Sequence, residues 1–142
     1  MTVHTTPHLN FRGTARQALE HYQSVFGGHL VAATYADMGA PADSPGAEEV
    51  VFGQIATDQG FQVMAYDVPA DRPWSRGEDP FFVSVRGDDP EEVTGYWDRL
   101  SDGATVLVPL APSAWSPLYG MLTDPFGITW VLDVSAPPEQ NR

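Results

Sequence analysis

Two stretches of the chain place apolar residues every three or four positions, the spacing that gives a helix one apolar face. The first stretch runs from Thr14 to Gly28. Its apolar positions are Ala18, Leu19, Tyr22, Val25 and Phe26. The hydroxyl of Thr14, followed three residues later by the amide of Gln17, is typical of a capping box at a helix start. Because Gly27 and Gly28 tolerate positive φ, we predict that the helix ends there.

The second stretch has a different start signal. Asp89 is suited to cap a helix, Pro90 fits its first position, and Glu92 stands three residues after the cap. The apolar face consists of Val93, Tyr96, Trp97 and Leu100. We predict a second helix that ends at Gly103.

The two predicted helices belong to an internal repeat, since one offset aligns Trp97 with Tyr22 and also Gly103 with Gly28. Short runs that alternate apolar and polar residues flank both helices and predict strands. These runs are 8–12, 29–36, 50–57 and 61–67 in the first half, and 81–86, 104–108, 116–123 and 128–134 in the second. Each half is therefore expected to be β-α-β-β-β. We predict one α+β domain over residues 1–142, with repeats at about 4–68 and 80–134.

The segments between these elements are rich in proline and glycine. Residues 69–79 are charged and aperiodic, which favours a linker between the two halves. Residues 37–49 lack any regular period and are a candidate mobile flap over a cavity. The tail 135–142 is expected to be frayed.

Charge and composition exclude several function classes. Lys+Arg 7 against Asp+Glu 19 gives a formal charge of −12, which disfavours nucleic acid as a partner. The chain has no cysteine and no lysine, which excludes disulfides, thiolate metal sites, lysine Schiff bases and a P-loop lysine. No signal-peptide pattern is present, and no apolar run approaches the roughly 18 residues of a membrane helix. We expect a cytoplasmic protein with no membrane partner.

Several short motifs, in this order, carry a resemblance to a known family. They are His8–Phe11, Tyr22–Gly28, Tyr35–Met38, Val63–Asp67, Trp97–Leu100, Val108–Leu110 and Trp115–Trp130. Over about residues 8–134 the chain resembles the vicinal oxygen chelate superfamily, which includes glyoxalase-like, bleomycin-resistance-like and dioxygenase-like proteins, and within it the PhnB-like branch. The resemblance implies a curved mixed sheet whose concave face encloses a cavity, and pairing into a homodimer. It does not choose a function, because the superfamily hosts both enzymes and binding proteins.

The resemblance also implies where a divalent metal would bind. Metal-dependent members carry His on the first strand of each half, and Glu or His on the last. His8 fills the first position, whereas Pro80 stands at its match in the second half. The last strands offer no carboxylate at the matching positions, and PhnB-like proteins commonly carry His where Phe52 stands and after the match of Trp115. We therefore expect no metal cofactor, while a divalent metal held with the help of Asp67 or across a dimer stays open.

The other polar candidates have simpler explanations. His4, His21 and His29 have no partner at ligand spacing, and the acidic run 88–92 is explained by the helix start. Asp124–Gly127 has the residues of a tight turn.

Two candidates keep alternatives open. Arg12 and Arg86 end the two first strands, where each is suited to bind an anionic ligand or to pair with surface acids; we favour pairing. Asp67 either caps the linker or faces the cavity.

Aromatic residues are the most distinctive signal. If Phe52 and Phe82 replace polar positions of the relatives, the cavity favours stacking on a planar or apolar ligand over chelation. The expected ligand contacts are His8, Asn10, Phe52, Tyr66, Phe82, Trp115, Tyr119 and Trp130. Trp74 is a further aromatic residue, in the linker.

Two hypotheses about function follow. The first is a metal-independent, dimeric protein that binds an aromatic or cationic small molecule. The second is an enzyme, either a metal-dependent isomerase, lyase or oxygenase, or an acid–base catalyst that uses His8 with Asp67 or Tyr66.

Overall fold

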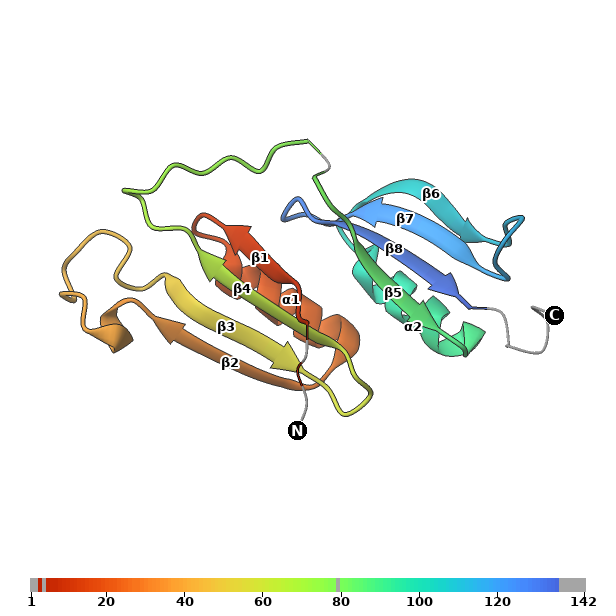
Figure 1. Ribbon diagram of the computed structural model, residues 1–142, viewed down its shortest axis with the longest axis horizontal. Helices are drawn as coiled ribbons and strands as arrows, with labels where there is room; N and C mark the ends of the chain where they lie inside the picture. Colours follow the sequence, from red (N-terminus) through yellow and green to blue (C-terminus); the bar gives the residue numbers. More distant parts are fainter. Residues whose placement is uncertain (1–2, 4, 79, 136–142) are drawn as a thin grey trace. The chain divides into compact units, whose positions relative to one another are not determined.

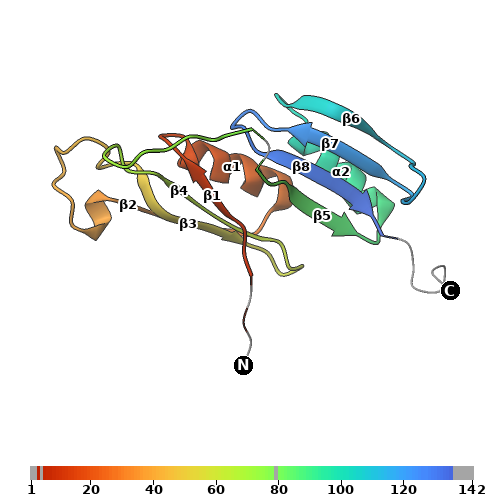
Figure 2. The same cartoon turned by 45° about the horizontal axis from the view of Figure 1, so that its top comes forward.

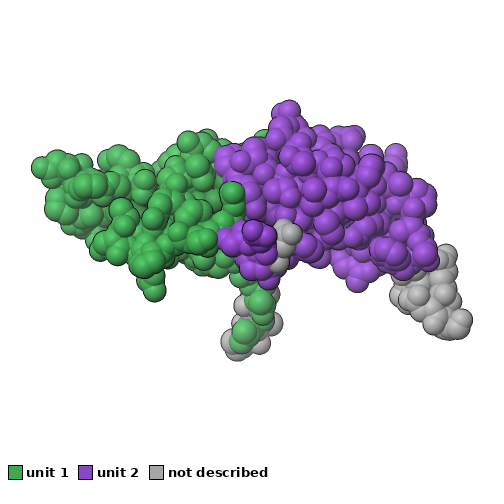
Figure 3. All heavy atoms as spheres, turned by 90° about the horizontal axis from the view of Figure 1, so that it is seen from above, with its two compact units in different colours: residues 1–76 green, residues 77–142 purple. Residues whose placement is uncertain are grey.

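The computed structural model describes residue 3, residues 5–78 and residues 80–135. The chain divides into two compact units, Met1–Arg76 and Gly77–Arg142, here unit 1 and unit 2, which Figure 3 colours separately. His4 and most of the tail 135–142 lie outside the described residues. Ser135, the described residue of that tail, donates its N–H to the Gly87 carbonyl at 2.8 Å. The expectation of fraying is therefore wrong for Ser135.

Unit 1 combines one helix with a four-stranded sheet. Its elements are β1 (His8–Phe11), α1 (Ala15–Phe26), β2 (His29–Thr34), the short 3-10 helix η1 (Ala36–Met38), β3 (Val50–Ala56) and β4 (Gln62–Asp67). The strands lie in the order β1-β4-β3-β2 (Figure 1). Strand β1 runs parallel to β4, and the other neighbours are antiparallel.

Helix α1 covers one face of this sheet, as Figures 1 and 2 show. Its apolar stripe is buried against alternate strand residues, which confirms the predicted helical face. These core residues include Leu9, Phe11, Leu19, Tyr22, Phe26 and Ile55. A Cβ added to Gly53 of β3 would lie 2.4 Å from Cδ1 of Leu19, so this close approach of helix and sheet requires glycine.

The start of α1 is satisfied by a residue far along the chain. Oδ1 of Asp67, at the end of β4, accepts hydrogen bonds from the N–H groups of Gly13 at 2.7 Å and Ala15 at 3.0 Å. The Thr14 side chain makes no capping hydrogen bond, so the predicted capping box with Gln17 is wrong. A carboxylate here supplies the acceptor that the first N–H groups of a helix lack.

Unit 2 repeats the plan. Its elements are β5 (Val83–Gly87), α2 (Pro90–Leu100), β6 (Thr105–Ala111), β7 (Tyr119–Thr123) and β8 (Thr129–Val134), with the strand order β5-β8-β7-β6. Strand β5 runs parallel to β8. Oδ1 of Asp89 accepts the Glu91 N–H at 3.0 Å, which confirms the predicted cap of α2. Trp97 of α2 packs over Gly120, where an added Cβ would lie 2.8 Å from the indole.

The predicted element order and the α+β class are confirmed, with corrections at several element ends. β2 ends at Thr34 and not at residue 36, and α2 ends at Leu100, before Gly103. β5 begins at Val83, so Phe81 and Phe82 precede the strand instead of forming its start. β6 continues to Ala111, and β7 begins only at Tyr119. The strands form two four-stranded sheets, one in each unit. Among the described residues, no helix is long and apolar enough to cross a membrane.

Candidate functional site

Within unit 1, no described helix or strand covers the sheet face opposite α1 (Figures 1 and 2). The strand register identifies the side chains on this face, because residues paired across strands share one side of a sheet. Strand β1 pairs His8 with Met64 and Asn10 with Tyr66. The face, here called the open face, comprises His8, Asn10, His29, Val31, Ala33, Phe52, Gln54, Ala56, Gln62, Met64 and Tyr66.

His8 is held by two neighbours on the open face. Its Nδ1 lies 3.1 Å from Oδ1 of Asn10, and its ring meets the ring of Tyr66 edge-on with centroids 5.2 Å apart. Since Oδ1 is an acceptor, Nδ1 carries the proton in this pair, and Nε2 of a neutral ring is then the acceptor. The arrangement presents Nε2 as a base or hydrogen-bond acceptor.

Phe52 adds an aromatic surface to the same face. Its side chain is 38% exposed on β3, the strand beside β4. The structure thus brings together four residues that the sequence analysis singled out, namely His8, Asn10, Phe52 and Tyr66. A planar or apolar molecule can stack on rings presented in this way.

Asp67 faces the opposite side of the sheet. It pairs with the buried Phe11, is 2% exposed, and its Oδ2 accepts the Val50 N–H at 2.9 Å, in addition to the two bonds at the start of α1. It neither faces a cavity nor caps the linker, which corrects both expectations. His8 and Asp67 cannot act as an acid–base pair across one surface, because their side chains lie on opposite faces.

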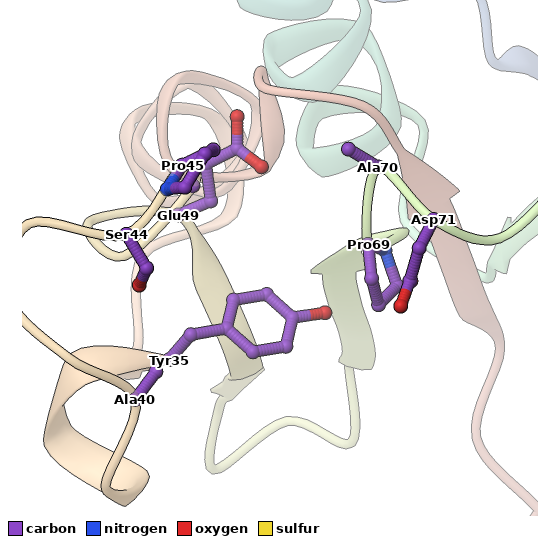
Figure 4. Close-up of a pocket in the computed structure, with 9 residues that line it drawn as sticks. Tyr35, Ala40, Ser44, Pro45, Glu49, Pro69, Ala70 and Asp71 are labelled. Atoms are coloured by element: carbon purple, nitrogen blue, oxygen red, sulfur yellow. The ribbon is translucent and has the colours of Figure 1, made fainter.

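A pocket of about 320 Å³ opens where β2 and β4 end and β3 begins. One wall is the loop 37–49 and the other is the segment Pro69–Asp71 that follows β4, while the ring of Tyr35 lies between them (Figure 4). The Tyr35 hydroxyl donates to the Asp67 carbonyl at 2.6 Å. The sequence pointed to the loop 37–49 as a flap over a cavity, but it did not indicate the second wall, because the two walls come from separate segments without a shared motif.

The loop 37–49 is more ordered than its composition predicts. The Tyr35 N–H donates to the Glu49 carbonyl at 3.0 Å and the Ala36 N–H to the Ala47 carbonyl at 2.9 Å, which ties the two ends of the loop together. Asp37 accepts the Thr34 N–H at 2.9 Å, and this bond lowers the pKa of its carboxyl. The predicted absence of regular structure is corrected only at residues 37 and 38, which belong to η1, since no helix or strand lies in residues 39–49.

Arg12 binds the backbone of the segment that forms the other wall of the pocket. Its guanidinium donates to the carbonyls of Pro69 and Arg72 and lies 5.8 Å from the ring centre of Trp74. The favoured pairing with surface acids is therefore wrong for Arg12, because backbone carbonyls and an indole ring take that place. Since these contacts fix the chain after β4, Arg12 has a structural role beside the pocket.

In unit 2, the aromatic candidates divide into exposed and buried ones. Trp115 is 66% exposed and meets Tyr119 edge-on with ring centroids 5.1 Å apart, and Phe82 is also exposed. Trp130 is 0% exposed, and its Nε1 donates to Oδ2 of Asp124 at 2.9 Å. This burial corrects the expectation that Trp130 contacts a ligand.

Two of the remaining polar candidates, Arg86 and Asp124, have structural partners. Arg86 forms an ion pair at 3.1 Å with Asp133. The favoured pairing with an acid is confirmed, but Asp133 is buried and not a surface acid. Oδ1 of Asp124 also accepts the N–H groups of Phe126 and Ile128, which confirms the predicted turn. His29 is exposed at the start of β2.

The repeated β-α-β-β-β plan and the parallel pairing of first and last strands can now be compared with known families. A sequence model described as the Glyoxalase/Bleomycin resistance protein/Dioxygenase superfamily matches residues 4–132. The chain belongs to this superfamily. The resemblance stated from the sequence is therefore confirmed at the level of the superfamily.

Two solved structures have a fold similar to that of this chain. Protein PA1353 from Pseudomonas aeruginosa is 27% identical, with a TM-score of 0.83, and the match covers 94% of this chain and 98% of that one. The PhnB protein from Bacillus cereus is 23% identical, with a TM-score of 0.70 over 94% and 100% of the two chains. At that identity the likeness shows the fold alone. No curated protein matches the sequence.

The superfamily fold allows the metal positions implied by the resemblance to be tested. The register places Ser84 opposite Val131 in unit 2, as it places His8 opposite Met64 in unit 1. Ser84, and not Pro80, therefore matches His8, because Pro80 precedes β5. In the part of the chain that the structure describes, no three His, Cys, Asp or Glu side chains gather as a metal centre would need. The donor set does not fit the metal site of the metal-dependent members.

Proposed function

We propose that the protein binds a planar or apolar small molecule on the open face of unit 1. One observation supports this most directly: a half-exposed cluster of rings, His8 with Tyr66 and Phe52 nearby, on a sheet face without cover inside unit 1. Small-molecule sites are mostly apolar and aromatic, with few polar groups that fix orientation. Asn10 and Gln54 supply such groups on the same face.

The proposed binding does not use a metal. His8 is the one imidazole at the matched ligand positions, since Ser84 stands at the equivalent place in unit 2. A hydroxyl and a single imidazole make a poor donor set for a divalent ion. Elemental mass spectrometry on chelator-free protein, followed by titration with manganese, iron, nickel and zinc, tests this. A stoichiometric ion would contradict metal independence.

Unit 2 offers a second aromatic surface for ligand contacts. We assign Phe82, Trp115 and Tyr119 to it, because Trp115 and Tyr119 form an exposed edge-on pair. Trp115→Ala is expected to weaken strongly a ligand bound on this surface of unit 2, whereas His8→Ala is expected to weaken modestly a ligand bound on the open face of unit 1.

We also propose a cytoplasmic homodimer. Edge strand β6 supports pairing because it exposes three consecutive apolar side chains, Val106, Leu107 and Val108. Sedimentation that gave a mass near 15.5 kDa at micromolar concentration would contradict the dimer.

The experiment that tests the binding proposal is a thermal-shift screen of planar aromatic compounds, with affinities of the best hits measured by calorimetry. Phe52→Ala is expected to weaken binding about tenfold, because stacking contributes about 1 kcal/mol or slightly more. Phe81→Ala is the matched control, since Phe81 is an exposed phenylalanine of unit 2 without an assigned contact. Equal loss in the two variants would contradict the open face as the site.

A second candidate function is acid–base catalysis by His8. Its support is the hydrogen bond to Asn10, which leaves Nε2 as the base of a neutral ring. Under this alternative, His8→Ala abolishes turnover while ligand affinity changes little. Loss of affinity without any turnover in the wild type supports binding instead.

A further inference from the structure

The pocket beside the loop 37–49 has no part in the proposed function, yet its size and lining are those of a small-molecule site. Its volume of about 320 Å³ lies at the lower end of the range for small-molecule sites, about 300–1,000 Å³. Apolar contacts come from Ala40, Pro45, Pro69 and Ala70, and the ring of Tyr35 spans the space between the two walls (Figure 4).

Two carboxylates stand on opposite walls of this pocket. Glu49 lies on the loop side and Asp71 on the side of the segment after β4 (Figure 4). Within residues 5–78, no side chain is hydrogen-bonded to or paired with either carboxylate, and no basic residue lines the pocket. Glu49 is partly buried, and its two oxygens would lie 3.5 Å from a Cβ added to Gly13 and 3.2 Å from a Cβ added to Gly46.

Both side-chain hydroxyl groups of the pocket donate hydrogen bonds to backbone carbonyls of the protein itself. Tyr35 donates to the Asp67 carbonyl at 2.6 Å, and Ser44 donates to the Pro41 carbonyl at 2.5 Å. Each hydroxyl therefore offers only lone pairs to a ligand. Together with Glu49 and Asp71, every polar side chain of the pocket presents acceptors. Such a site complements a ligand that is rich in donors.

The charge around Tyr35 agrees with this conclusion. Burial raises the pKa of its hydroxyl, and the charges of Tyr66, Asp67, Glu49 and Asp71 raise it further. Negative potential of this kind favours a cation, and the face of a tyrosine ring adds cation–π attraction.

The chemistry favours an organic cation over a metal ion. A metal would need more hard donors than two carboxylates on opposite walls, and no cluster of three or more His, Cys, Asp or Glu occurs in the described residues. Apolar walls instead suit the carbon skeleton of a small molecule. We propose that this pocket binds the ammonium or guanidinium group of a small organic molecule, with Glu49 and Asp71 as counter-ions and Tyr35 against the cation. This site is independent of the open face.

The test is a titration of the full chain with benzylammonium chloride, followed by amide chemical shifts in NMR spectra. Benzyl alcohol is the neutral probe of nearly the same size. Benzylammonium is expected to shift the amides of Tyr35, Gly46 and Ala70 in a saturable way, at least tenfold more tightly than benzyl alcohol.

Variants identify the counter-ions. Glu49→Gln and Asp71→Asn are each expected to weaken benzylammonium binding about five- to tenfold, since each removes one charge-assisted partner. Glu48→Gln is the matched control, because it removes the same charge from the neighbouring exposed position, which does not line the pocket. Its affinity is expected to stay within about twofold of the wild type. The NMR spectra also show that each variant is folded, and the exposed Asp71 provides a variant outside the core.

Four outcomes would overturn the proposal. They are equal binding of the two probes, equal weakening by Glu48→Gln and Glu49→Gln, saturable shifts confined to the open face, and no saturable shift with millimolar benzylammonium. Failure of the open face as a site is measured separately with Phe52→Ala, which is expected to leave benzylammonium binding unchanged.

Discussion

The parallel strand pairs β1–β4 and β5–β8 hold matching positions in the two units and fill them with different chemistry. Asn10 and Tyr66 face each other in unit 1, whereas Arg86 and Asp133 face each other at the same register in unit 2. In unit 2 the two charges neutralise each other, since Nε of Arg86 lies 3.1 Å from Oδ1 of Asp133. In unit 1 the open face instead presents an imidazole and aromatic rings to solvent. A duplicated scaffold therefore does not duplicate its site.

The difference extends to the cores. Register aligns β4 with β8 so that Val63 and Trp130 occupy matching buried positions. We expect Trp130→Ala to destabilise the protein by about 3–5 kcal/mol, because it removes a buried indole and its bond to Asp124. Val63→Ala removes fewer atoms and is expected to cost less. Urea denaturation measures both, and a neutral Trp130→Ala would contradict its placement in the core.

The second largest expected difference in stability concerns the residues that cap the starts of α1 and α2. Asp67 serves α1 across 52 residues from Ala15, whereas Asp89 caps its own helix locally. Asp67→Ala leaves three N–H groups without their acceptor and is expected to cost about 3 kcal/mol. Asp89→Ala is the control, with an expected loss of about 1 kcal/mol. Equal losses in chemical denaturation would show that the distant cap is not special.

His8 of β1 and Ser84 of β5 are matching positions that face away from the helices. Substitution of His8 is expected to change ligand affinity, by less than the two stability effects above. His8→Ala is expected to weaken an open-face ligand about threefold, since it removes one polar contact of roughly 0.6 kcal/mol. Ser84→Ala, the matching change in unit 2, is expected to leave that affinity unchanged. Calorimetry measures the ligand affinity of both variants. Equal weakening by His8→Ala and Ser84→Ala would contradict the assignment of the ligand to unit 1.

The ion pair itself should contribute least to stability. Arg86 is largely exposed, so Arg86→Ala is expected to destabilise the protein by less than about 1 kcal/mol, and by less still at high salt. Thermal unfolding at two salt concentrations measures this. A loss of several kcal/mol would mean that the pair acts as a buried one.

Periodicity and cap chemistry predicted the fold well because both are local. The apolar spacing of α1 and α2 and the Asp89–Pro90 start needed no knowledge of distant residues. The start of α1 was mispredicted because a tertiary contact from Asp67 takes the role of the Thr14 side chain. No local pattern around Thr14 contains that information.

The site was predictable only in part. Of the expected ligand contacts, His8, Asn10 and Tyr66 share one face. Pro80 was matched to His8 because Phe81 and Phe82 continue the apolar pattern before β5 begins. Trp130 was misassigned because both faces of β8 are largely buried, so alternation does not distinguish them. The pocket with Glu49 and Asp71 depends on two loops that only the folded chain brings together.

The hydrogen bonds from Arg12 to the chain after β4 have a consequence for synthesis on the ribosome. All the strands of unit 1 precede Val68, whereas the carbonyls that Arg12 binds belong to Pro69 and Arg72. A nascent chain that has emerged only as far as Val68 contains the complete sheet sequence but lacks one wall of the pocket. The open face and the pocket are thus completed at different moments of translation.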